Sequence, residues 1–343
     1  KSIEYLKKNQ NCFNLYGDQP FLQIKTLQQK DNAVIDKLDF TLSAGNNNRL
    51  FDHEASPSGR VFSSAWIALK LLTYQCFSPG GTIGVTEWGN KITSRNSGHA
   101  PCVEGSALHT LIRSKSLLDT LFMNLQTIKK IKNFTSMDWG KPIWEANINQ
   151  NTEQLLQTTK TYLGRLVPLS RGILLNQNKK KITLVNGLDY PKLPETREAT
   201  TTVLKRNSSK AKNPYYYLRT EPDKHPWREL TSILSKTNSD KTGGALSLIN
   251  LNNTNSNIDL WTGGIAADKG KIIDQGEWTF NIPKGIFKNN SLNKYENGVI
   301  LAVDGEKVLL KSIKEYYKNL KTQTRSISKA KLMYWDFLEK KYG

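Results

Sequence analysis

Residues 164–171 read GRLVPLSR and lie between an expected helix and an expected strand. The apolar spacing over Thr152–Leu163 is that of an amphipathic helix, which Gly164 is expected to end. The short apolar runs Ile173–Leu175 and Ile182–Val185 predict two strands. The sequence around this stretch therefore predicts an α+β fold.

Several elements are expected upstream of this stretch. Residues 3–8 predict a helix, and residues 38–42 (LDFTL) alternate like a strand. Ser63 or Ser64 can cap a helix that runs to about Phe77. Its expected buried side consists of Trp66, Leu69, Leu72 and Phe77. Pro79-Gly80-Gly81 should stop this helix, and the glycine-rich segment Thr82–Glu104 is long enough for a functional loop.

Downstream, a further amphipathic helix is predicted by Leu117, Leu118, Leu121, Phe122, Leu125 and Ile128. Ile258–Phe280 predicts a hairpin around Gly263-Gly264, and Glu306–Leu320 and Ser328–Lys341 predict two helices. We expect a large mixed domain over residues 1–285, followed by the incomplete start of a helical bundle over residues 286–343. The first residue is Lys and not Met, so we expect the chain to begin within a longer protein.

Charge points to a polyanionic partner. Lys and Arg total 49 against 30 Asp and Glu, which gives a formal net charge of +19. Residues 151–250 hold 17 basic and 8 acidic residues, and residues 301–343 hold 10 and 5. Such clustering favours phosphate contacts. A basic surface can also serve solubility or acidic membranes, so charge alone does not decide.

Enzymatic functions find little support. The histidines lack HxxxH or HxH spacing, and the three cysteines, which we expect to be buried free thiols, lack CxxC spacing. Asp52-His53-Glu54 could suggest a metal or acid–base site, but neighbouring side chains diverge and more often bond their own loop. Gly80-Gly81-Thr82-Ile83-Gly84 follows a helix and lacks the Gly-Lys-Ser/Thr ending of a phosphate-binding loop. We expect no catalytic residue, no metal and no cofactor.

Two segments suit nucleic-acid binding. Gly80, Gly81 and Gly84 lack a Cβ, so their backbone could approach a minor groove or a phosphate. They could equally form only a helix stop and a loop. A second segment combines basic and aromatic residues: Lys205, Arg206, Lys210, Lys212 and Tyr215-Tyr216-Tyr217. These tyrosines could stack on bases, or they could be a strand that is half core and half surface.

The GRLVPLSR stretch, with its flanking helix and strand, resembles the CasA-type large subunit of the type I-E CRISPR Cascade complex. Other segments match in the same order and span nearly the whole chain, without the family's N-terminal part and most of its C-terminal four-helix bundle. They are Asp18–Gln23 (DQPFLQ), Ser43–His53 (SAGNNNRLFDH), the helix Ala65–Phe77 with its Pro-Gly-Gly, Leu111–Leu125, Pro142–Glu145 (PIWE) and Pro226–Leu230 (PWREL).

The resemblance implies a cytoplasmic, non-catalytic nucleic-acid-binding protein with no membrane partner. Such subunits recognise the protospacer-adjacent motif in duplex DNA, promote strand separation and nucleate the R-loop. Their partners are the crRNA, target double-stranded DNA, the other Cascade subunits and an effector helicase-nuclease. Sequence beyond the motif is read by guide pairing, as in RNA-guided Cas9.

By position, the resemblance assigns candidate residues to each contact. The loop near the crRNA 5′ handle would contain Asn46, Asn47, Asn48, Arg49 and Phe51. Gly80, Gly81 and Gly84 would form the glycine loop, and Lys205 or Arg206 a basic finger in the minor groove. The strand-separating wedge would be Asp268-Lys269, where a well-known family version has Asn-Gln. Lys cannot accept a hydrogen bond, and Asp repels phosphates.

Two other functions stay open. A general RNA- or single-strand-binding module would use the lysines at 179–181 and the basic residues between 205 and 212. A metal-dependent nuclease would centre on Asp52, His53 and Glu54.

Overall fold

The computed structural model describes most of the chain. The described residues are 1–44, 52, 59–83, 85, 87, 88, 91, 92, 96–146, 152–193, 196–207, 211–238, 240, 242–253, 257–287, 290–323 and 326–342. Within them, no helix has the length and apolar composition that a membrane crossing requires.

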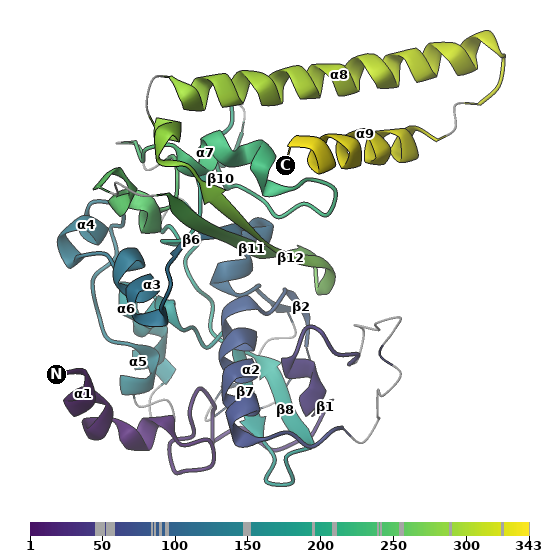
Figure 1. Cartoon of the computed structure of the whole chain (residues 1–343). Helices are drawn as coiled ribbons and strands as arrows, with labels where there is room; N and C mark the ends of the chain where they lie inside the picture. Colours follow the sequence, from purple (N-terminus) through teal and green to yellow (C-terminus); the bar gives the residue numbers. More distant parts are fainter. Residues whose placement is uncertain are drawn as a thin grey trace.

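Helices and short antiparallel strands alternate irregularly along the chain (Figure 1). The α-helices are α1 Ser2–Lys8, α2 Ser64–Phe77, α3 Leu117–Asn124, α4 Ile128–Lys132, α5 Thr152–Thr158, α6 Tyr162–Leu166, α7 Leu230–Leu234, α8 Ser291–Asn319 and α9 Ile327–Tyr342. The strands are β1 Ala33–Val34, β2 Gly81–Thr82, β3 Glu87–Trp88, β4 Lys91–Ile92, β5 Asn96–Ser97, β6 Leu108–Arg113, β7 Arg171–Leu175, β8 Lys181–Asn186, β9 Val203–Lys205, β10 Tyr215–Tyr217, β11 Ile258–Asp268 and β12 Lys271–Ile282. Helices with several open sheets confirm the predicted α+β class.

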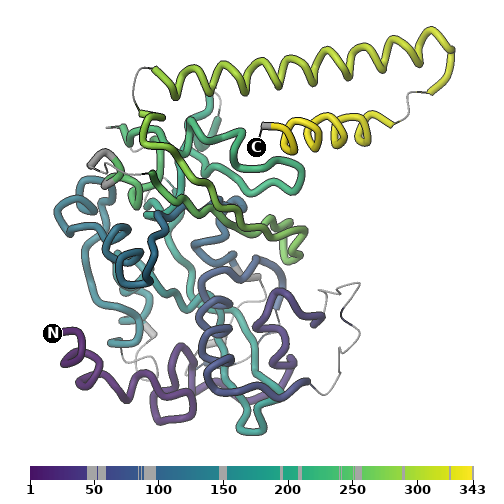
Figure 2. Tube along the Cα trace, viewed as in Figure 1, coloured from purple at the N-terminus to yellow at the C-terminus, as the bar shows by residue number. Residues whose placement is uncertain are grey.

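One core forms around helix α2 and the sheet β1-β8-β7. The sheet pairs residues 33 and 34 with residues 182 and 181, far away in sequence. Figure 2 shows this as the purple N-terminal segment running beside the teal strands. The predicted strands at 173–175 and 182–185 are confirmed as parts of β7 and β8. The core includes Leu22, Ile24, Ile35, Ile67, Leu71, Ile173 and Ile182.

Helix α2 has the predicted cap and most of the predicted buried side. The Ser63 hydroxyl accepts a hydrogen bond from the Trp66 backbone N–H at 3.3 Å, which confirms the cap. Three residues of the expected buried side, Trp66, Leu72 and Phe77, pack against the core. The expectation is wrong for Leu69, which is 66% exposed. The buried residues of the helix are Ile67, Leu71, Tyr74 and Gln75. Polar Gln75 is inside because its amide bonds the carbonyls of Leu22 and Arg171.

A second core lies against the sheet β12-β11-β6 and holds Ile112, Ile233, Ile258, Leu260 and Ile282. β11 and β12 form the predicted hairpin, but the expected turn at Gly263-Gly264 is wrong. Both glycines pair inside the ladder, and the turn is at Lys269-Gly270, between the paired residues Asp268 and Lys271. A Cβ on Gly264 would lie 2.7 Å from the Ala107 carbonyl oxygen, so close packing explains this glycine.

The last two helices pack side by side at the top of Figure 1. Tyr334 of α9 donates a hydrogen bond to the Ala302 carbonyl of α8. Glu339 of α9 accepts hydrogen bonds from Arg228 at 3.0 Å and from the Trp227 indole at 3.2 Å. α8 begins at Ser291, well before the expected start at Glu306. Glycines weaken the intrinsic helix preference of this part, and tertiary packing overrides it.

Two other expectations are wrong in detail. Residues 38–42 do not form a strand: Leu38 ends a 3-10 helix (Ile35–Leu38), and Asp39 then accepts a hydrogen bond from the Thr41 backbone N–H. The single helix expected over Thr152–Leu163 is two helices, α5 and α6. Its expected end, Gly164, lies inside α6, where its N–H donates to the Thr161 cap. In both places a local bond between a side chain and the backbone, at Asp39 and at Thr161, sets the observed structure.

Buried arginines tie the coil segments to the cores. Arg165 pairs with Glu198 at 2.7 Å and donates to the Pro191 carbonyl. Arg197 donates to the carbonyls of Thr201, Gly243 and Gly244. The most deeply buried, Arg171, is 2% exposed, donates to the carbonyls of Pro79, Gly98 and Ser170, and also interacts with the buried Tyr74 hydroxyl. These cations satisfy backbone acceptors that no strand reaches.

We predict that Arg171→Met lowers the free energy of unfolding by about 3 kcal/mol or more, because the carbonyls of Pro79 and Gly98 lose their donor inside the protein. Urea unfolding measures the change. The control is Arg113→Met, since Arg113 is half exposed and pairs with Asp259 at the surface; we expect a loss below about 1 kcal/mol. Equal losses in the two variants would contradict a structural role specific to Arg171.

Candidate functional site

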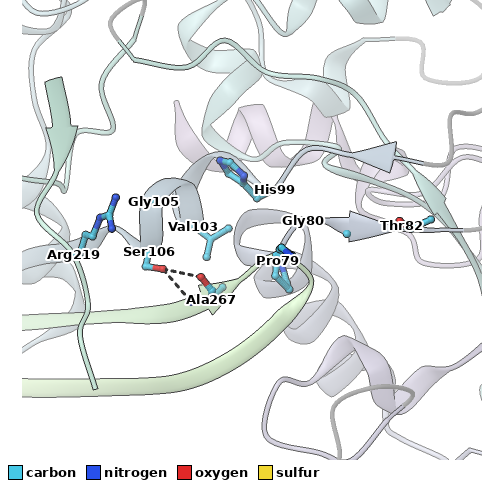
Figure 3. Close-up of a pocket in the computed structure, with 11 residues that line it drawn as sticks. Pro79, Gly80, Thr82, His99, Val103, Gly105, Ser106, Arg219 and Ala267 are labelled. Carbon is cyan, nitrogen blue, oxygen red and sulfur yellow. Dashed lines mark hydrogen bonds between the residues drawn. The ribbon is translucent and has the colours of Figure 1, made fainter. Parts of the chain in front are cut away.

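A cavity of about 580 Å³ opens where the segment after α2 meets the hairpin turn (Figure 3). Four segments contribute to it: the glycine segment that follows Phe77, the 3-10 helix η3 (Pro101–Ser106), the residues after β10 and the end of β11 with its turn. Its lining residues are Pro79, Gly80, Gly81, Thr82, His99, Val103, Gly105, Ser106, Arg219, Ala267 and Lys269.

The glycine segment and the hairpin turn meet backbone to backbone. A Cβ on Gly81 would lie 3.0 Å from the Gly270 Cα, and a Cβ on Gly270 would lie 2.8 Å from the Gly80 carbonyl oxygen. Gly81 also has a φ of +130°, which side-chain-bearing residues rarely adopt. This contact places Lys269, the first residue of the turn, at the cavity.

Hydrogen bonds from η3 fix the other wall. The Ser106 hydroxyl accepts from the Ala267 backbone N–H at 3.0 Å and donates to the Ala267 carbonyl at 3.3 Å, as Figure 3 shows. Ala107 pairs with Arg219 in an antiparallel bridge, and the Thr220 N–H donates to the Ser106 carbonyl at 2.7 Å. The backbone therefore holds Arg219 beside the cavity.

The charges that line the cavity are positive. Arg219 and Lys269 are exposed, neither has an ion-pair partner among the described residues, and no described lining residue carries a carboxylate. Burial lowers the pKa of His99 to about 4, with a smaller contribution from Lys192, Arg171 and Arg165, so this histidine is neutral near pH 7. A small cationic cavity with bare backbone at one wall suits a phosphate.

Arg171 holds both ends of the glycine segment, which is the stretch of chain between Pro79 and Gly98. Its guanidinium donates to the carbonyl of Pro79 and, at 3.0 Å, to that of Gly98. One buried side chain thus anchors both ends of the chain between α2 and His99. This is the last residue of the GRLVPLSR stretch, so the motif has a defined structural role.

The structure brings three of the sequence-predicted DNA-binding residues together: Gly80, Gly81 and Lys269 all line the cavity. Asp268 is exposed at the end of β11, next to Lys269, and pairs with Lys271 across the hairpin. Gly84 lies outside the described residues.

Lys205 and Arg206 do not line the cavity. Lys205 ends β9, pairs with Asp240 at 3.7 Å and lies 5.9 Å from the Tyr215 ring centre. The Arg206 guanidinium lies 5.1 Å from the Tyr216 ring centre. The third tyrosine, Tyr217, is buried. The Tyr run is thus half core and half surface, with cations over its outer rings.

The loop expected near the crRNA handle is anchored at its base. Asn46, Asn47, Asn48, Arg49 and Phe51 lie outside the described residues, as do His53 and Glu54. Asp52 accepts a hydrogen bond from the Ser43 N–H at 2.6 Å and pairs with Arg60 at 2.6 Å. Arg60 also pairs with the buried Asp36. The Asp52 carboxylate therefore has a structural role: it bonds the backbone of Ser43 and the side chain of Arg60. This is the alternative to metal binding that the sequence left open for Asp52.

The remaining titratable groups weighed for chemistry have structural partners. His109 is buried and donates from Nε2 to the Cys102 carbonyl at 2.6 Å, while its Nδ1 lies 2.7 Å from the Thr200 hydroxyl. His225 pairs with Glu339. The three cysteines are free thiols and are half-buried, less buried than expected. No group of three potential metal ligands occurs within the described part of the chain.

A family model for the CRISPR-associated protein Cse1 matches residues 2–343, almost the whole chain. The chain belongs to the Cse1 family. The resemblance to CasA-type subunits inferred from the sequence is thereby confirmed.

Named Cse1 relatives share both sequence and fold. The CasA/Cse1 protein of Thermus thermophilus is 24% identical over 311 residues, which are 87% of this chain and 58% of that protein. The structure of T. thermophilus CasA superposes with a TM-score of 0.69 at 19% identity, covering 96% of this chain and 66% of that one. The structure of Thermobifida fusca Cse1 superposes with a TM-score of 0.74 at 16% identity, covering 98% of this chain and 69% of that one.

A solved CRISPR RNA-guided surveillance complex contains a similar chain, with a TM-score of 0.67 at 14% identity, covering 98% of this chain and 71% of that one. At these identities the structural matches show the fold alone. The chain spans a little over half the length of the curated Cse1 relative that it matches.

Sequence reasoning missed Arg219, His99 and Ser106 in the cavity wall. Arg219 follows the Tyr run by two residues, and only its alternation with the buried Leu218 signals that it points outward. His99 and Ser106 stand at the ends of the segment around η3, and nothing local in the sequence distinguishes them.

Glu104 of η3 supplies a pH test of this wall. Burial raises its pKa to about 7, although Arg165 and Lys192 act in the opposite direction. A carboxyl whose pKa rises on folding destabilises the folded state as pH increases from about 4.5 to about 7. We predict that Glu104→Gln is close to neutral at pH 4.5 and stabilises by up to ~3 kcal/mol above pH 7.

Urea unfolding of both proteins across this pH range measures the difference, with the exposed Glu87→Gln as the control variant. A stabilisation by Glu104→Gln that is the same at pH 4.5 and pH 7.5 would show that the pKa of Glu104 does not rise on folding and that η3 does not bury its carboxyl.

Proposed function

We propose that this chain is the CasA-type large subunit of a Cascade complex and recognises the protospacer-adjacent motif of duplex DNA at the cavity. The observation that carries the proposal is the meeting of bare glycine backbone and two cations, Arg219 and Lys269, in one opening where the described residues supply neither an ion-pair partner nor a lining carboxylate. Family membership supplies the context.

The two halves of the site suit different parts of the DNA. Backbone at Gly80 and Gly81 can approach the shallow minor-groove edges, which carry a degenerate pattern and favour short motifs. Lys269 is at the tip of a long hairpin and has a φ of +53°, so its side chain leaves the strand direction. A cation at the tip of a hairpin can enter between the two DNA strands and bind a phosphate. This would favour DNA strand separation and R-loop nucleation.

Other contacts complete the proposed role. The loop that Asp52 and Arg60 close would carry Asn46 to Phe51 to the crRNA 5′ handle. Lys205 or Arg206, with Gly84, would extend the DNA contact beyond the cavity. The helices after residue 285 would begin a bundle of the full protein. We further propose that the chain acts without catalysis in the cytoplasm, bound to other Cascade subunits, and helps to recruit the effector helicase-nuclease.

A general RNA- or single-strand-binding module is the second candidate, supported by the net charge. Its aromatic platforms are less favourable than the sequence suggests. Cations already lie over Tyr215, Tyr216 and Tyr16, the last facing Lys179 at 5.8 Å. Base stacking would have to displace them.

We predict that Lys269→Asn and Arg219→Gln each weaken binding of target duplex by the assembled complex about 5- to 30-fold. Asn tolerates the positive φ of the turn, so the first variant removes the charge and keeps the hairpin. Because a phosphate contact releases counterions, each variant should also reduce the slope of log affinity against log salt concentration by about one. Electrophoretic mobility shifts at several salt concentrations measure both effects.

Lys271→Gln is the matched control: Lys271 is exposed on the same hairpin, two residues away, but does not line the cavity. We expect it to bind duplex within about twofold of the wild type. If all three variants bind alike, the cavity is not the DNA site.

A further inference from the structure

Helix α3 turns its apolar side away from the protein. The sequence predicted an amphipathic helix here, and such a helix normally buries that side. Instead Leu117 is 76%, Phe122 66% and Leu118 62% exposed. We call the exposed set the α3 ridge: Leu117, Leu118, Leu121, Phe122 and Leu125.

The polar side chains of α3 hold it in this orientation. The Asn124 amide accepts from the Ile112 N–H at 2.9 Å and donates to the Ile112 carbonyl at 2.7 Å, so it pairs with strand β6 as another strand would. The Thr120 hydroxyl accepts from the Ser114 N–H at 3.0 Å. Turning the apolar side inward would leave these backbone groups of β6 unpaired. The outward direction of the ridge is therefore built into the contacts of α3.

Exposed lysines flank the ridge in the sequence. Lys115 precedes it, and Lys129 and Lys132 of α4 follow it; all three are exposed. The acidic residue within the ridge segment, Asp119, accepts a hydrogen bond from the Ser116 hydroxyl at the helix start. A partner surface should thus combine an apolar groove with an acidic rim.

We propose that the α3 ridge docks into an apolar, acidic-rimmed groove of another protein subunit of the same RNA-guided complex. The proposal rests on the function proposed above, which makes a protein subunit the available partner. Helix-in-groove binding uses anchors at positions i, i+3, i+4 and i+7, which is the spacing of Leu118, Leu121, Phe122 and Leu125.

Other occupants fit the ridge less well. A second copy would bring two chains of net charge +19 and two sets of flanking lysines together. Nucleic acid is a poor partner, because its surface of phosphates and polar base edges would not bury the four leucines of the ridge. A lipid surface would accept apolar residues flanked by lysines, but α3 is a single eight-residue helix fixed on a strand, which presents a narrow ridge and not a broad face.

The place of the ridge allows simultaneous binding of protein and DNA. In Figure 1, α3 and α4 lie at the left of the molecule, and the hairpin turn of β11 and β12 lies at the right. A subunit seated on the ridge would leave the cavity open to duplex.

The test uses the crRNA-bound complex of the source organism's own remaining subunits, purified without this chain and without DNA. Interferometry measures the affinity of the added full chain as wild type, Leu118→Glu, Leu118→Lys and Leu69→Glu. We expect Leu118→Glu to weaken binding about 30-fold and Leu118→Lys clearly less, because the rim is acidic. Leu69 of α2 is a leucine of similar exposure, 66%, so Leu69→Glu is the control and should bind as the wild type.

Equal affinity of the wild type and both Leu118 variants would overturn the ridge proposal and leave the proposed function standing. No binding by the wild type would overturn both. Two further outcomes would also overturn the ridge proposal: sedimentation of the wild type, but not of Leu118→Glu, with phosphatidylglycerol vesicles in place of complex binding, or a wild-type dimer that Leu118→Glu dissociates.

Discussion

The buried guanidinium of Arg171 is the contact on which the candidate site depends. It joins strand β7 of the first core to the carbonyls of Pro79 and Gly98, the two points where the glycine segment leaves and re-enters the protein. Burial lowers the pKa of Arg171, and the carbonyl dipoles and the Tyr74 hydroxyl stabilise its charge in place of a carboxylate among the described residues. Arg171 thus ties both ends of the glycine segment to the first core.

The second requirement is close packing between distant pieces of backbone. Gly81 and Gly270 touch because neither has a Cβ, and this contact joins the first core to the hairpin of the second. Ser106 of η3 adds a pair of hydrogen bonds to Ala267 of β11. Four segments of the chain thus enclose one opening, and the cations at its rim, Arg219 and Lys269, come from two of them.

Local patterns predicted much of the fold and part of the site. The α2 cap, the strands around residues 173 and 183 and the hairpin follow from capping and apolar spacing, and the family resemblance gave Gly80, Gly81 and Lys269. Charge counting was less specific, because it does not separate Arg165, Arg171 and Arg197, which bond carbonyls inside, from Arg219, which faces solvent. The sequence also could not predict which side of α3 faces solvent. Asn124 bonds the backbone of Ile112 in β6, and the helical periodicity of the sequence contains no information on such tertiary contacts.

The most direct measurement of the central claim compares duplex binding by the complex assembled with and without this chain, on targets that differ only in the flanking motif. The account predicts that tight binding requires both the chain and one class of flanking base pairs, because glycine backbone and a hairpin cation meet DNA at one fixed place. If the chain raises affinity equally for every duplex, it acts as a non-specific clamp, and motif recognition at the cavity is contradicted.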